Sequence, residues 1–299
     1  MRLPATTLLL TAIAPTVWGT TYIVTTELLP GYSPITVAML RALLAGLFLL
    51  LIVRQLPKGT WWLRSFILGA LNFSVFWSLL FVSAYRLPGG VAATVGAVQP
   101  LIVIFLAALV LGNKIRILSV IAAIVGLSGV ALLVLTSSAS LDALGIAAGL
   151  AGACSMGLGT VLTRKWQPPA SLLAFTAWQL TAGGLLLVPM SFLADVSWGT
   201  PTVMNVFGLL WLGLIGAALT YIAWFKGVTR LDPAVVSSLG LLSPVTAVLV
   251  GWVWLHQALT PFQILGAILV ISSIWLGQHG ITDKSLPNSQ APRAGSVVR

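Results

Sequence analysis

The stretches LPGGVAATVGAVQP, residues 87–100, and LDPAVVSSLGLLSP, residues 231–244, decide the fold, because they repeat one pattern of Gly, Pro and apolar residues. Sliding the chain by 144 residues superposes them and also pairs residues outside the two stretches. The pairs in this ungapped register are Gly69 and Gly213, Phe81 and Phe225, Arg86 and Arg230, Gly96 and Gly240, Pro100 and Pro244, and Ala123 and Ala267. Gly and Pro matching in one register indicate an internal duplication rather than chance similarity.

A second, weaker register extends the duplication toward the N-terminus. A shift of 138 residues places Gly19 on Gly157 and Gly46 on Gly184. We therefore predict two repeats, over residues 1–138 and 139–279.

The composition places these repeats in a membrane. Only 7% of the 299 residues are charged, 59% are hydrophobic, and the mean hydropathy is +1.06. A soluble domain carries about 25% charged residues, so this chain could not cover a water-facing surface. Ten apolar runs remain between charges, Pro, Gly and polar clusters, each close to the length of about 20 residues that spans a bilayer as a helix. They cover residues 6–27, 34–53, 64–85, 88–111, 116–136, 143–163, 171–194, 203–226, 232–255 and 261–279. The sequence thus predicts an all-α integral membrane protein with ten transmembrane helices.

The basic residues predict the orientation of these helices. If the N-terminus is inside, 13 of the 15 Lys and Arg residues lie on the inner side, Arg86 lies outside and Arg41 lies within a helix. Positively charged loops stay in the cytoplasm, so we predict a multi-pass protein of the cell inner membrane with both termini inside. Residues 280–299 are predicted to be a disordered cytoplasmic tail. Five helices per repeat turn the second repeat upside down, as in many secondary transporters.

Several other classes of protein fit the sequence poorly. The net charge of +10 comes from basic residues that stand singly or in pairs between apolar runs, whereas a nucleic-acid surface needs them clustered. Cys154 is the only cysteine, so we expect no metal site, and no motif indicates a cofactor. An integral-membrane enzyme normally has a convergent set of His, Asp or Glu, and this less favoured alternative stays open. The expected partners are a small-molecule solute and the lipid bilayer.

Particular residues carry a family resemblance over residues 6–279. They are Trp18-Gly19 in the first run, Arg41 in the second, the Pro100 and Pro244 runs, and the glycines of the fifth and tenth runs. With these features the chain resembles the EamA branch of the drug/metabolite transporter superfamily, and within it the YddG-type amino-acid exporters. This resemblance implies a central path lined by helices three, four, eight and nine, with one and six completing its walls. Helices five and ten would lie at the periphery, in a monomer or a homodimer that contacts through them.

The function implied by the resemblance is export of small organic solutes by alternating access. Amino acids, aromatic and other neutral ones first, are the expected substrates, with other metabolites or drugs as the alternative. A neutral polar and aromatic cavity would suit zwitterionic or amphipathic solutes.

Polar residues inside the apolar runs are candidates for this cavity, because a buried polar atom without a partner is costly in lipid. They are Asn72, Thr94, Gln99, Ser237, Ser238 and Ser243. Aromatic candidates are Trp18, Tyr22, Phe76, Trp77 and Tyr221, of which Trp77 and Tyr221 coincide under the 144-residue shift. Ordinary helix packing is the alternative for every one of these residues.

Three further residues are candidates for hinge or gating roles. Pro100 and Pro244 each remove one helical hydrogen bond, so they could bend equivalent helices. Arg41 costs about 2.5–3.5 kcal/mol near the middle of a membrane helix and therefore needs a partner or an aqueous path. Glu27 is a possible partner, and a structural role for Arg41 stays open beside contact with the substrate.

Overall fold

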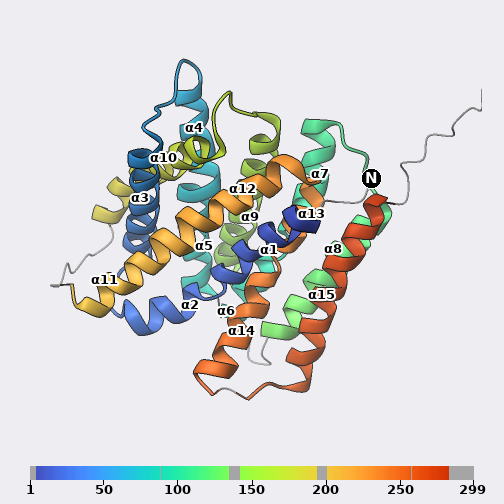
Figure 1. Cartoon of the computed structure of the whole chain (residues 1–299). Helices are drawn as coiled ribbons and strands as arrows, with labels where there is room; N and C mark the ends of the chain where they lie inside the picture. The colour runs from blue at the N-terminus through green and yellow to red at the C-terminus, as the bar shows by residue number, and fades with distance from the viewer. Residues whose placement is uncertain (1–4, 88, 135–141, 194–200, 257, 283–299) are drawn as a thin grey trace, which may run out of the picture.

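The computed structural model describes residues 5–87, 89–134, 142–193, 201–256 and 258–282, and these ranges are helical apart from short connections (Figure 1). Within them, nine helical segments are long and apolar enough to cross a membrane. These segments are Pro34–Val53, Trp61–Arg86, Val91–Leu111, Ile117–Val134, Ala143–Lys165, Leu172–Leu193, Val203–Arg230, Pro233–Trp254 and Pro261–Gln278. The protein is thus an all-α, multi-pass membrane protein.

The first apolar run is not the unbroken helix expected over residues 6–27. Helix α1 (Ala5–Trp18) ends at a turn, and α2 (Thr21–Ile23) and the π-helix η1 (Val24–Leu28) follow it. The turn contains Gly19, where an added Cβ atom would lie 2.6 Å from the Ser243 carbonyl oxygen. Close packing against a distant helix therefore accompanies this break, and hydropathy alone carries no sign of it.

Five of the nine segments are single helices. They are α3 (Pro34–Val53), α8 (Ile117–Val134), α9 (Ala143–Lys165), α10 (Leu172–Leu193) and α15 (Pro261–Thr282). In Figure 1, α8 and α15 lie side by side at one edge of the bundle, and α3 and α10 lie toward the opposite edge.

The other four segments are interrupted, and the interruptions match under the 144-residue shift. One pair contains π-helical turns: η2 (Ala70–Ser74) lies between α4 (Trp61–Gly69) and α5 (Val75–Arg86), and η3 (Trp211–Leu219) lies between α11 (Val203–Leu210) and α12 (Thr220–Arg230). The other pair contains breaks, between α6 (Gly89–Gly96) and α7 (Gln99–Leu111) and between α13 (Pro233–Leu239) and α14 (Leu242–Trp254). Pro100 and Pro244 stand just after these two breaks.

The contacts between α3 and α10 also match under the 138-residue shift, because one glycine of each helix packs against the equivalent position of the other helix. A Cβ atom added at Gly46 would lie 2.5 Å from the Thr181 nitrogen, and one at Gly184 would lie 2.7 Å from the Leu43 side chain. A shift of 138 residues carries Gly46 to Gly184 and Leu43 to Thr181. Equivalent residues therefore make equivalent contacts across the bundle.

This contact predicts that Gly46→Val lowers the free energy of unfolding by about 2 kcal/mol or more, because overpacking forces backbone shifts. Thermal unfolding of the purified protein in detergent measures the loss. Gly96→Ala is the control for adding a Cβ atom to a helical glycine, since an added Cβ there meets no described atom within 4 Å. Equal stability of Gly46→Val and wild type would contradict the close contact.

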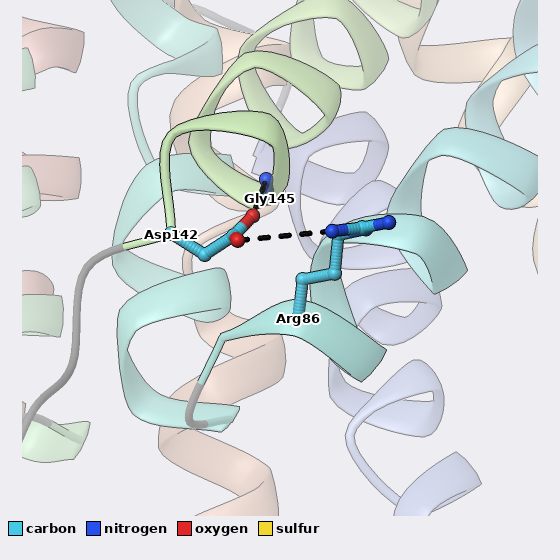
Figure 2. Close-up of polar contacts among 3 residues, drawn as sticks. All are labelled: Arg86, Asp142 and Gly145. Carbon is cyan, nitrogen blue, oxygen red and sulfur yellow. Dashed lines mark hydrogen bonds and ion pairs between the residues drawn. The ribbon is translucent and has the colours of Figure 1, made fainter.

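Charged residues at the two ends of α9 lie in different surroundings. At its C-terminal end, Arg164 and Lys165 directly precede Trp166 in the sequence. The Arg64 guanidinium lies 5.4 Å from the centre of the Trp166 ring. At its N-terminal end, Asp142 accepts a hydrogen bond from the Gly145 nitrogen at 2.6 Å and pairs with Arg86 at 3.7 Å (Figure 2). Arg64, Arg164 and Lys165, which are predicted to lie inside, are thus at the opposite end of α9 from Arg86, which is predicted to lie outside.

Candidate functional site

Aromatic rings from three segments meet in the core, and we name this group the central aromatic cluster. Its members are Trp18 of α1, Phe73 of η2, Trp77 of α5, and Tyr221, Trp224 and Phe225 of α12. Phe73 joins the two predicted repeats, with its ring centre 5.3 Å from that of Trp77 and 4.7 Å from that of Tyr221. Tilted and edge-on contacts at these distances are the favourable aromatic arrangements.

Polar groups border the cluster at η3. The Gly216 carbonyl oxygen accepts hydrogen bonds from Arg41 Nη2 and Thr220 Oγ1, both at 2.9 Å. Thr220 Oγ1 in turn accepts a hydrogen bond from Trp18 Nε1 at 3.0 Å. The Arg41 guanidinium also lies 4.9 Å from the centre of the Trp77 ring, a cation–π distance. The π-helical turn η3 therefore provides one backbone acceptor, the Gly216 carbonyl, for the side chains of Arg41 and Thr220, and both of these side chains contact the central aromatic cluster.

Arg41 is buried in this position, and it does not form the ion pair with Glu27 that the sequence left possible. Glu27 is exposed in η1, and its carboxylate accepts a hydrogen bond from Thr26 Oγ1 at 3.4 Å. Arg41 reaches Gly216 and Trp77 instead, because α3 packs against η3.

A second polar group lies where η2 meets α9 and α10. Asn72 Nδ2 donates to Gln179 Oε1 at 2.8 Å and, over a longer distance of 3.4 Å, to Thr163 Oγ1. Gln179 is fully buried, and within the ranges that the structure describes its Nε2 has no hydrogen-bond partner. Asn72 thus forms its side-chain bonds with α9 and α10 rather than with the rings of the central aromatic cluster.

The two polar groups occupy equivalent places in the repeats. The 138-residue shift carries Arg41 to Gln179, and the 144-residue shift carries Asn72 to Gly216. Sequence reasoning overlooked Gln179, although the register that pairs Gly46 with Gly184 could have identified it.

The segments Val91–Leu111 and Pro233–Trp254 place their candidate residues differently. Gln99, at the start of α7, has a buried Nε2 that finds no hydrogen-bond partner among the described residues. Ser237 and Ser238 donate to carbonyl oxygens of their own helix, at 3.1 and 2.8 Å, which matches the packing alternative. Thr94 and Ser243 are half-buried.

The remaining candidates are Phe76, Tyr22 and the two prolines. Phe76 packs at the edge of the core that contains the central aromatic cluster. The side chain of Tyr22 lies outside the described part of the structure. Pro100 and Ser238 line one narrow crevice between α7, α8, α13 and α15.

Open space is found nearer one end of the bundle. A pocket of about 600 Å³ is lined by Asn113, Arg164, Lys165 and Asp232, together with neighbouring apolar residues. These residues belong to the end that the charge distribution predicts to be cytoplasmic. The rings of the central aromatic cluster, in contrast, are packed against one another, with Tyr221 3% and Trp77 5% exposed.

Comparison with known proteins identifies the family of this protein. The profile of the EamA-like transporter family matches the chain twice, over residues 5–135 and 143–277. The chain therefore belongs to the EamA-like transporter family, and it is a membrane transporter by that membership.

Individual relatives span most of the chain. It is 43% identical over 267 residues to Protein PecM of Dickeya dadantii (strain 3937), which covers 89% of this chain and 90% of PecM. It is 25% identical over 208 residues to a "Probable terminal-alkyne amino-acid exporter" of Streptantibioticus cattleyicolor, covering 70% of each protein. One crystal structure, 19% identical, matches with a TM-score of 0.79 over 93% of this chain and 98% of the other. At that identity the likeness shows the fold alone.

The position of the two prolines leads to a test of the predicted hinges. We expect Pro100→Ala and Pro244→Ala each to reduce transport several-fold while folded protein in the membrane changes less, because restored helical hydrogen bonds would stiffen equivalent breaks. Transport normalised to membrane abundance measures this effect. Pro189, inside α10, supplies the control Pro189→Ala. Normal transport by both single variants and the double variant would remove the hinge role.

Proposed function

We propose that this protein exports small neutral organic solutes, amino acids and especially aromatic ones first, by alternating access in the cell inner membrane. The observation that carries the proposal is the central aromatic cluster, which joins both repeats and is bordered by Arg41 and Gly216. Aromatic walls with a few polar groups suit amphipathic solutes of this size. Among relatives, one is named an amino-acid exporter, which favours this substrate class over other metabolites or drugs and accords with the YddG-type resemblance.

The proposed architecture has ten spans in two inverted repeats, over residues 1–138 and 139–279. Residues 5–28 would supply the tenth span beside the nine long segments. The two matches of one family profile and the exchanged contacts of Gly46 and Gly184 support the repeats. We further propose that helices α8 and α15, which pack against each other at the edge of the bundle, provide the contact of any homodimer.

The depths of the two polar groups support alternating access. Arg41 and Gln179 each stand seven positions after the first residue of their helices, Pro34 and Leu172. Seven residues of helix rise about 10 Å. Since α3 and α10 would begin at opposite membrane faces, the Arg41 group lies nearer the outside and the Gln179 group nearer the cytoplasm. Opening one group while the other stays closed would expose the central aromatic cluster to one side at a time.

The proposed topology predicts that reporters fused at either terminus are cytoplasmic. The reason is that basic residues concentrate on one side, 13 against 1. A reporter inserted next to Arg86 should instead lie outside. A terminal reporter found outside, or an internal one found inside, would contradict the ten-span arrangement.

The direction of transport is tested by feeding cells a dipeptide that contains phenylalanine. Intracellular peptidases release the amino acid, and cells that produce the protein should retain less of it and release more into the medium. Cells that carry an empty vector and cells that produce Tyr221→Ala are the controls. Equal retention in all three would contradict export of this solute.

A further inference from the structure

Among the described residues, no carboxylate pairs with the buried guanidinium of Arg41. Arg41 is 8% exposed, one guanidinium nitrogen donates to the Gly216 carbonyl oxygen, and Nε has no hydrogen-bond partner in the described part of the chain. Across the described ranges, the ion pair that forms is Arg86 with Asp142, at an exposed end of the bundle. A carbonyl oxygen and an aromatic face stabilise a guanidinium, but neither neutralises its charge.

The duplication shows that packing at this position does not require a charge. The equivalent residue in the other repeat is Gln179, a neutral amide. The backbones at Arg41 and Gln179 have corresponding neighbours. A Cβ atom added at Gly69 would lie 2.8 Å from the Gln179 carbonyl oxygen. A Cβ atom added at Gly213, the equivalent of Gly69, would lie 3.7 Å from the Arg41 carbonyl oxygen. The same helix crossing is therefore built once with an amide and once with a guanidinium, so the crossing by itself does not account for the positive charge of Arg41.

The place of the charge indicates what it binds. Arg41 lies against Trp77, a member of the central aromatic cluster, and Thr220 and Trp18 extend the same hydrogen-bonded group. A guanidinium recognises carboxylates through charge-assisted hydrogen bonds, and its planar shape makes that recognition directional. The adjacent rings supply apolar surface for the rest of such a molecule.

We propose that Arg41 binds the carboxylate of the transported solute, and that the substrates are therefore organic acids or amino acids with an apolar or aromatic group. The proposal rests on the proposed transport function and names its substrate class. The Gly216 carbonyl holds the guanidinium in place, the free Nε–H donates to the carboxylate, and the central aromatic cluster parts to admit the apolar group. A compound with the same ring but no carboxylate binds weakly.

Binding to the purified protein tests this independently of transport. The probes are phenylalanine, 3-phenylpropionate and 3-phenylpropanamide, and the readout is the shift in Tm with probe concentration. We expect both carboxylates to stabilise wild type, and the amide to need at least about tenfold higher concentration, because a charge-assisted hydrogen bond is lost. An amide that stabilises wild type as well as 3-phenylpropionate does would overturn the proposal, whatever the variants do.

Two variants at Arg41 and one control localise the effect. Arg41→Gln, which copies Gln179, should weaken both carboxylates about tenfold or more and leave the amide unchanged, and Arg41→Lys should keep part of the preference. Arg64→Gln is the matched control, because Arg64 also lies over a tryptophan, at 5.1 Å from the centre of the Trp61 ring, but at the predicted cytoplasmic end. Equal weakening of all three probes by Arg41→Gln would show a structural role only. If Arg41→Gln does not fold, Arg41→Lys and the wild-type probe series decide the result.

The same material separates this proposal from the transport function. A wild-type protein that binds carboxylates selectively but moves no phenylalanine into proteoliposomes contradicts the proposed transport, while the assignment of Arg41 stands. A protein that transports phenylalanine and its carboxamide analogue equally well contradicts the assignment of Arg41, while transport stands.

Discussion

Trp77→Ala and Tyr221→Ala are each expected to weaken the apparent affinity for phenylalanine by about tenfold or more, and to affect alanine much less. The two rings lie in the central aromatic cluster and both contact Phe73. Truncating a ring removes apolar contact with a bulky substrate, worth about 25 cal/mol for each Å² of buried area. Competition for uptake by a panel of neutral amino acids, at matched membrane abundance, measures the change.

The control for this prediction is Trp61→Ala. Trp61 is also buried and makes edge-on contact with Phe175, but it belongs to a separate core group. Its truncation should cost similar stability without a preference between substrates. Unchanged affinities in both Trp77→Ala and Tyr221→Ala would show that the rings only pack the core. Gln99→Leu, which removes a buried amide, should instead weaken all zwitterionic substrates alike.

Gln179→Leu is expected to lower the free energy of unfolding by about 1–3 kcal/mol, because it leaves a buried donor without its acceptor. The donor is Asn72 Nδ2, which keeps only the longer contact with Thr163. The double variant Asn72→Leu/Gln179→Leu should be more stable than the sum of the single losses implies, since both polar groups are then absent. Unfolding of the four proteins in detergent closes this double-mutant cycle. Additive losses would show that the two amides are energetically independent.

Hydropathy predicted the spans well, because membrane helices must satisfy their backbone internally and bury or expose apolar surface along about 20 residues. The nine long segments overlap nine of the predicted runs, and α3 has the predicted bounds. The first run was the exception, since the turn at Gly19 accompanies contact with Ser243, far away in the sequence. The π-helical turns also escaped prediction, because they preserve the apolar composition of the segment while changing which side chains face inward.

The candidate site was predicted in part. Trp18, Trp77 and Tyr221 were selected from sequence, and the structure brings them to one cluster. Asn72 was placed in the same cavity, yet its hydrogen bonds are with Gln179 and Thr163. Sequence shows the depth of a residue in a membrane helix more readily than the direction it faces, because helix rotation is set by packing with neighbours.

The most direct test of the proposed transport of neutral amino acids is counterflow in proteoliposomes. Purified protein is reconstituted with a high internal concentration of unlabelled phenylalanine, and entry of labelled phenylalanine is followed. We expect rapid, saturable accumulation that unlabelled aromatic amino acids inhibit and that Tyr221→Ala reduces strongly. Protein-free vesicles should show none. If wild-type vesicles show no more counterflow than protein-free vesicles for phenylalanine or any other neutral amino acid, the proposed function is wrong.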